Sequence, residues 1–112
     1  MTTPEHAVKD RVKRRLNEYG PELKHFWCVQ NGMGSPALDC IGCYRGLHFE
    51  IETKAPGKVL TPRQEQTKLG TERSGAPVFI IGDDAGLARL TLWLDAVRVI
   101  DMRALLGLRP DK

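Results

Sequence analysis

The sequence has no apolar run approaching the ~18–20 residues that a membrane span needs. Its first ten residues also lack the apolar core of a signal peptide, so an intracellular protein without a membrane partner is expected. Neither sign of charge dominates, because 17 Lys and Arg stand against 14 Asp and Glu. The net charge of +3 therefore supports a nucleic-acid partner only weakly. A length of 112 residues predicts a single domain, 1–112, with one core.

Cysteine is scarce. The three cysteines are an odd number, which does not suggest the disulfide framework of a small secreted protein. Cys40 and Cys43 form a C-x-x-C pair, but zinc would need two further ligands, and only Cys28 and three histidines are available. Positions three apart on a strand point to opposite faces, so a strand here would prevent chelation. We expect the pair to be structural.

The apolar spacing predicts an α/β fold with a central mixed β-sheet flanked by helices. A first helix begins with Thr3 as N-cap and Pro4 at the first position, and ends at Gly20-Pro21. Its inward face is formed by Val8, Val12, Leu16 and Tyr19. Strands are expected at residues 26–30, 38–44, 47–54 and 78–81, with a glycine-rich turn at residues 31–36. The run at 78–81 is unbroken, which is typical of a strand buried on both faces.

Two more helices complete the predicted order, α-β-β-β-α-β-α. Thr61 and Gln64 have the capping-box spacing and begin a rather polar helix that ends near residues 74–75. The last helix is amphipathic through Leu87, Leu90, Leu94 and Val97. Residues 101–112 are expected to add a short helical turn through Met102, Leu105 and Leu106.

The hairpin between residues 38 and 54 carries the most chemical information. A two-residue turn at Arg45-Gly46 would pair Tyr44 with Leu47, and in that register Asp39 lies opposite Glu52. Glu50 and Lys54 share this face, because strand side chains alternate. The other face would be the core side, with Leu38, Cys40, Tyr44, Leu47, Phe49, Ile51 and Thr53.

Two opposed carboxylates repel each other, and a cation between them relieves the repulsion. Mg²⁺ is usually held by one or two carboxylates together with water and substrate phosphate, and it lowers the pKa of its bound water. Lys54 could orient that water or neutralise the developing charge. The pattern therefore fits phosphodiester hydrolysis. The alternative is a solvated strand face on which Lys54 bridges Asp39 and Glu52.

Basic residues are concentrated in two segments, Lys9 to Arg15 and Lys54 to Lys68. Such stripes suit phosphate contacts, and the candidate nucleic-acid-binding residues are Lys9, Lys13, Lys58 and Arg63. A solvated helix face is the alternative for the first segment. Glu5 lies three residues before Val8, which would turn it inward toward a partner or a metal. Alternatively, it is an exposed residue favoured by the helix dipole.

An ordered series of motifs resembles the VRR-NUC family, a branch of the PD-(D/E)xK nucleases with standalone phage and bacterial members. The series covers about residues 4–82 and consists of Gly34-Ser35-Pro36-Ala37-Leu38-Asp39, Arg45-Gly46, Ile51-Glu52-Thr53-Lys54-Ala55-Pro56-Gly57-Lys58 and Thr61-Pro62-Arg63-Gln64. The resemblance implies a restriction-endonuclease-like fold and a bacterial or phage-infected host cytoplasm. The usual adjacent Pro-Asp pair is split here, since Ala37 and Leu38 separate Pro36 from Asp39.

The resemblance also implies a role for each matching residue. Asp39 and Glu52 would bind the metal, with the Thr53 carbonyl as a further ligand. Lys54 would be the catalytic lysine. Gln64 and Glu5 match the glutamine and the acidic residue of the family's flanking helices. Gln64 could instead reach back to Thr61 as a capping residue, and both roles stay open.

The implied activity is that of a Mg²⁺- or Mn²⁺-dependent DNA endonuclease. Standalone family members resemble Holliday-junction resolvases, so branched DNA and a homodimer are expected. The C-terminal region is the expected interface through Leu92, Trp93, Val99, Met102, Leu105 and Leu106, unless these close the core. The alternatives are a non-catalytic nucleic-acid-binding module, a nickase or flap nuclease, and a restriction-type duplex nuclease.

Overall fold

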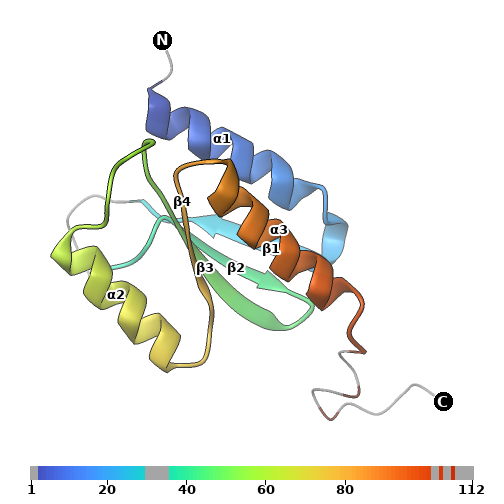
Figure 1. The fold of residues 1–112 in the computed structure, drawn as a ribbon. Coiled ribbons are helices and arrows are strands. Elements are labelled where there is room, and N and C mark those ends of the chain that lie inside the picture. Colours follow the sequence, from blue (N-terminus) through green and yellow to red (C-terminus); the bar gives the residue numbers. More distant parts are fainter. Residues whose placement is uncertain (1–2, 30–35, 102–103, 105–106, 108–112) are drawn as a thin grey trace.

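A four-stranded mixed sheet lies at the centre of the computed structural model, with helices on both of its faces (Figure 1). The structure describes residues 3–29 and 36–101, together with residues 104 and 107. The elements in chain order are α1 (Pro4–Asn17), a 3₁₀ turn (Gly20–Glu22), β1 (Leu23–Trp27), β2 (Cys40–Tyr44), β3 (Leu47–Thr53), α2 (Pro62–Arg73), β4 (Val78–Ile81) and α3 (Asp84–Arg98). The predicted α/β class and element order are thus confirmed. Within the described part, no helix has the length and hydropathy of a membrane span.

One face of the sheet is covered by α1 and α3, which enclose the hydrophobic core (Figure 1). Both helices present the residues that the spacing predicted. The buried set is Val8, Val12, Leu16 and Tyr19 from the first helical segment, and Leu87, Leu90, Leu94 and Val97 from α3. They pack with Cys40, Tyr44, Phe49 and Ile51 of the hairpin. At about 25 cal/mol per Å² of apolar surface removed from water, this core is the main stabilising feature of the domain.

The β2–β3 hairpin has the predicted register, with Tyr44 paired to Leu47 and Cys40 paired to Ile51. Arg45 and Gly46 have φ values of 53° and 92°. Positive φ at both central positions is characteristic of the two-residue turn whose twist matches that of the strands. The turn therefore fixes which residues of β3 face the core, since a one-residue slip would exchange the two faces.

The strand boundaries differ from the expectation at two points. β1 lies three residues earlier than predicted, because Leu23 directly after the 3₁₀ turn is buried and starts the pairing with β2. β2 begins at Cys40 rather than at residue 38, so Asp39 lies just beyond the ladder. Residues 31–35 of the glycine-rich turn predicted at 31–36, and the predicted helical turn through Met102, Leu105 and Leu106, fall outside the described residues.

β4 is an outer strand of the sheet, parallel to β3 and connected to it through α2. The prediction of a strand buried on both faces is only partly correct. Ile81 is buried, whereas the other three residues of β4 are half-buried. Helices lie on both sides of the strand, but among the described residues its only strand partner is β3.

α2 covers the opposite face of the sheet with a polar stripe. Its half-buried residues recur at helical spacing and are Gln64, Thr67, Lys68 and Thr71. None of the twelve residues of α2, all of which are described, is buried. The stripe is polar because the sheet beneath it carries Glu50 and Glu52, and Thr71 Oγ1 donates to Glu50 Oε1 at 2.9 Å. The predicted polar character of this helix is therefore a consequence of the face on which it packs.

The same face continues across β2 and β1 beyond α2. The register aligns Phe26, Ile41 and Glu50 in one row across the three strands. Phe26 is 67% exposed and Ile41 is half-buried. Within the described part of the chain, the contacts of α2 with the sheet are mainly to β4, so α2 leaves the β1 and β2 part of this face uncovered.

Candidate metal and active site

Two carboxylates lie at the end of the hairpin that is distant from its turn. Glu52 is near the end of β3, and Asp39 immediately precedes β2. Both are buried, with Asp39 7% and Glu52 3% exposed. The two residues are also directly linked, because the Asp39 amide donates to Glu52 Oε1 at 3.2 Å. Buried acidic groups are uncommon without a partner or a metal, so this pair is the strongest candidate for a functional site.

Thr53 fixes the orientation of Asp39. Its backbone amide and its Oγ1 both donate to Asp39 Oδ2, at 2.9 and 2.8 Å. The second oxygen, Oδ1, lies 3.8 Å from the ammonium of Lys9 on α1. Thr53 was predicted as a core-side residue and, through its carbonyl, as a metal ligand. It is fully buried, and its side chain has the additional task of holding Asp39. The role of its carbonyl stays a prediction.

Gln64 connects the site to the start of α2, because its side chain caps the helix and also reaches Glu52. Its Oε1 accepts from the Thr61 amide at 3.0 Å, and its own amide donates to Thr61 Oγ1 at 3.2 Å, which completes the capping box. Its Nε2 donates to Glu52 Oε2 at 3.1 Å. The two ends of one side-chain amide thus cap the helix and hold the carboxylate.

Glu52 is held in surroundings that favour its protonated form. Burial, and then the negative charge of Asp39, raise the pKa of Glu52 from 4.5 to about 7. The Asp39 amide and the ammonium of Lys54 act in the opposite direction. Lys54 Nζ lies 4.0 Å from Glu52 Oε2 and is largely shielded from solvent. The fold therefore concentrates negative charge at this point and compensates it only in part.

The remaining predicted ligand, Glu5, lies in the first turn of α1. It is exposed, so the expectation that it shares the inward face of Val8 is wrong. Its position matches the alternative of a carboxylate favoured by the helix dipole. Glu5 also precedes Lys9 by one helical turn, on the side of α1 that reaches Asp39. Its role as a metal ligand stays a prediction.

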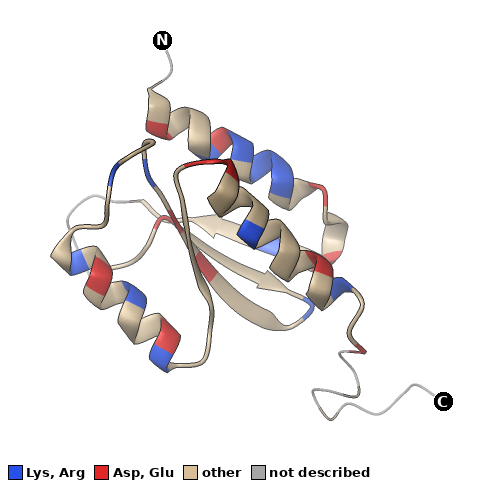
Figure 2. Ribbon diagram, in the orientation of Figure 1, with Lys and Arg blue, Asp and Glu red and all other residues tan. Residues whose placement is uncertain are grey.

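The predicted nucleic-acid-binding residues are distributed on three elements. Basic positions recur along α1, and further ones lie on α2 and on the loop before it (Figure 2). Lys9 contacts Asp39, while the ammonium of Lys13, one turn later, lies 5.1 Å from the centre of the Trp27 ring. Lys58 and Arg63 are exposed. Of these four residues, Lys9 therefore contacts the acidic pair directly, and the DNA-binding role of all four stays a prediction.

The three cysteines are free thiols. Cys40 is buried and Cys43 is exposed, as expected for strand positions three apart. Cys28 is half-buried, and its amide donates to the Asp39 carbonyl at 2.8 Å. Among the described residues, no group of three or more His, Cys, Asp or Glu side chains is arranged to hold a metal. Any ion at Asp39 and Glu52 would therefore be completed by backbone, water or substrate oxygens, as is usual for Mg²⁺.

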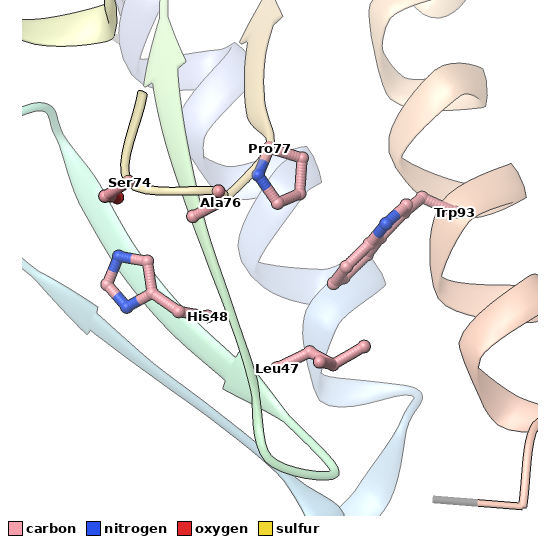
Figure 3. A pocket seen from close by; sticks show the side chains of 7 residues that line it. Leu47, His48, Ser74, Ala76, Pro77 and Trp93 are labelled. Carbon is pink, nitrogen blue, oxygen red and sulfur yellow. The ribbon is translucent and has the colours of Figure 1, made fainter. Parts of the chain in front are cut away.

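A surface pocket of about 330 Å³ lies at the other end of β3, away from Glu52. Figure 3 shows Leu47 near Trp93 of α3 and His48 beside Ser74. His48 Nε2 is hydrogen-bonded to Glu50 Oε2 at 2.6 Å, so its ring is engaged within the sheet. The pocket contains none of the predicted site residues, and the acidic pair remains the better candidate for catalysis.

Sequence reasoning missed two contacts of this site. The Lys9–Asp39 pair joins segments 30 positions apart, and the Thr53 Oγ1–Asp39 bond joins opposite faces of the predicted hairpin. The only available signal for Lys9 was its membership of the basic segment. Comparison of the chain with protein-family models, with curated proteins and with solved structures finds no match.

Proposed function

We propose that the chain is a metal-dependent DNA endonuclease of the PD-(D/E)xK kind, similar to the VRR-NUC family. The observation that carries the proposal is the buried pair of Asp39 and Glu52, with the ammonium of Lys54 4.0 Å from Glu52. The mixed sheet and the hairpin carrying all three residues are compatible with a restriction-endonuclease-like fold. The motif series from Asp39 to Gln64 supports the same family.

The donor set fits a hard divalent cation. Burial, and then the charge of Asp39, raise the pKa of Glu52, and the two neighbouring carboxylates provide oxygen ligands of the type preferred by Mg²⁺ or Mn²⁺. Such an ion, when bound, supplies a water of lowered pKa and stabilises negative charge on a phosphate. Asp39 and Glu52 would hold it, and Thr53 and Gln64 keep the two carboxylates oriented.

Lys54 is placed where its ammonium could stabilise the negative charge that develops on a phosphate oxygen during hydrolysis. Its side chain is only 14% exposed, so its ammonium is poorly screened by water. A lysine beside a phosphate oxygen stabilises the charge that accumulates there during attack. Because hydrolysis moves charge onto that oxygen, the contact strengthens in the transition state and contributes to kcat.

The cleavage assay that tests the proposal uses junction, flap, duplex and single-stranded DNA with Mg²⁺ or Mn²⁺. Cleavage is expected with either ion, and Asp39→Asn and Glu52→Gln should each abolish it while the protein stays folded. Thermal unfolding of the variants provides the control for folding. Retention of near-normal turnover in either variant would exclude this site, and a folded wild type that binds every DNA without cutting would favour the non-catalytic module.

Branched DNA is the proposed substrate, cut by a two-fold homodimer. Two cuts related by symmetry need two sites, and two-fold dimers are the commonest oligomers. Leu92 and Val99 support a contact through α3 and its end, because they are 74% and 82% exposed. Trp93 instead packs against Phe49 and Phe79 in the monomer. Light scattering should give a species twice the monomer mass of 12.5 kDa. A monomer that persists with junction DNA would leave a nickase or flap nuclease.

A further inference from the structure

Lys9 occupies a position that the proposed chemistry does not explain. It lies on α1 beside Val8, and α1 is fixed to the core by the buried side chains of Val8, Val12 and Leu16. From there its ammonium reaches 3.8 Å from Asp39 Oδ1, across an interface between two elements. The Lys9 side chain is 31% exposed and that of Asp39 only 9%. A buried carboxylate needs such a partner, since an uncompensated charge in this environment is strongly destabilising.

The two oxygens of Asp39 differ in their availability. Oδ2 accepts two hydrogen bonds from Thr53, at 2.9 and 2.8 Å. Oδ1 faces Lys9. A divalent cation that binds Asp39 without breaking the bonds to Thr53 would therefore bind through Oδ1. The ammonium and the divalent cation repel each other, so Lys9 and the metal compete for the same oxygen.

We propose that Lys9 is the resident counter-ion of Asp39, that the divalent cation replaces it, and that the released ammonium binds a phosphate of the DNA substrate. This inference rests on the proposed function. The exchange needs only a side-chain movement, because the lysine stem has four flexible carbons and its exposed part borders solvent. The backbone of α1 stays anchored in the core.

Once released from Asp39, the Lys9 ammonium would have a DNA phosphate as its new partner. Lys13 lies one turn further on the same side of α1, so the two lysines form a short basic row beside the acidic pair. A DNA backbone along this row would bring a phosphate to Lys9. Metal and DNA should then assist each other: the metal frees Lys9 for the phosphate, and the phosphate draws Lys9 away from Asp39. By linkage, each ligand raises the affinity of the other by the same factor.

The test measures Mn²⁺ binding by calorimetry or electron spin resonance, without DNA. Lys9→Met removes the charge but retains most of the apolar stem. It should bind Mn²⁺ roughly threefold to tenfold more tightly than wild type, because the competing ammonium is absent. Lys9→Arg should restore weaker binding. Lys13→Met is the matched control, because Lys13 contacts Trp27 rather than Asp39 and its loss should leave Mn²⁺ affinity unchanged. Lys9→Gln replaces Lys9→Met if the latter is unfolded.

A second measurement follows Mn²⁺ affinity in the presence of a short, non-cleavable DNA with phosphorothioate linkages. Wild type should bind Mn²⁺ more tightly with DNA than without it, and Lys9→Met should lose most of this increase. Unchanged or weaker Mn²⁺ binding by Lys9→Met without DNA would overturn the inference, as would an undiminished DNA effect. If wild type binds Mn²⁺ and cleaves DNA, such a result refutes the inference alone. If wild type binds no Mn²⁺, the proposed function fails as well.

Discussion

The Glu52 carboxyl should make the metal-free protein less stable as the pH rises. Its pKa is raised from 4.5 to about 7 in the folded chain, chiefly by burial. The folded chain therefore holds this proton more tightly than the unfolded chain. The contribution to stability is fully present below the unfolded pKa near 4.5, and it is lost as pH rises through about 7.

The size of the effect follows from the same two values. At about 1.4 kcal/mol per pKa unit, raising the pH from 5 to 8 should lower the free energy of unfolding by roughly 2–3 kcal/mol through this group alone. Glu52 is only 3% exposed, so solvent screening reduces the figure little. For a domain with a total stability of roughly 5–15 kcal/mol, a change of this size is easily measured.

The assay is urea unfolding at a series of pH values, in the presence of a chelator, for wild type and Glu52→Gln. Wild-type stability should decrease toward pH 8, and the variant should lack that part of the slope. Slopes rather than absolute stabilities are compared, because the new amide meets the Nε2 donor of Gln64 at the former Oε2 position. Adding Mg²⁺ or Mn²⁺ at pH 8 should stabilise wild type and not the variant. Identical slopes for the two proteins would refute the assignment of this buried, proton-retaining carboxyl.

Three further predictions concern the site, the open sheet face and the fold. Lys54→Ala should lower kcat by about 10²–10³ with little change in DNA affinity, measured by single-turnover cleavage and by binding with Ca²⁺; an equal loss of affinity would make Lys54 a phosphate anchor. Phe26→Ala should weaken binding of DNA with unpaired bases by about 1–3 kcal/mol and leave fully paired duplex unaffected, in fluorescence anisotropy with Ca²⁺, because Phe26 is 67% exposed, in one row with Ile41 and Glu50, and can stack on a base. Arg45→Met should destabilise the fold by roughly 1–3 kcal/mol in urea unfolding, because the Arg45 guanidinium donates to the Val97 and Arg98 carbonyls at 2.7 Å and caps α3; an unchanged midpoint would show that these bonds are replaced by water.

The fold could be predicted from the sequence wherever a local pattern and the tertiary packing agree. The spacing of Val8, Val12 and Leu16 and the Thr61 capping box each point to one structure, and both are observed. The two-residue turn at Arg45-Gly46 fixed the register of the hairpin, and thereby brought Asp39 close to Glu52. These features depend on interactions between residues near each other in the chain.

The details that could not be predicted depend on packing between distant elements. The apolar run of β4 does not reveal that the strand is at the edge of the sheet, where three of its four residues stay half-buried. The basic segment of α1 does not reveal which lysine meets Asp39, because that depends on how α1 crosses the sheet. The sequence also does not reveal that one Gln64 side chain can cap α2 and reach Glu52 at the same time, through the two ends of its amide. The catalytic role of Gln64 stays a prediction.

The polar underside of α2 has a consequence for local motion. Without a buried apolar anchor, this helix is attached largely by hydrogen bonds, each with a net contribution of only about 1 kcal/mol. Its amide hydrogens should therefore exchange with solvent through local opening, while those of the well-anchored α1 exchange only on global unfolding. Each opening also withdraws Gln64 from Glu52. Local opening of α2 should therefore also remove a hydrogen bond that orients Glu52.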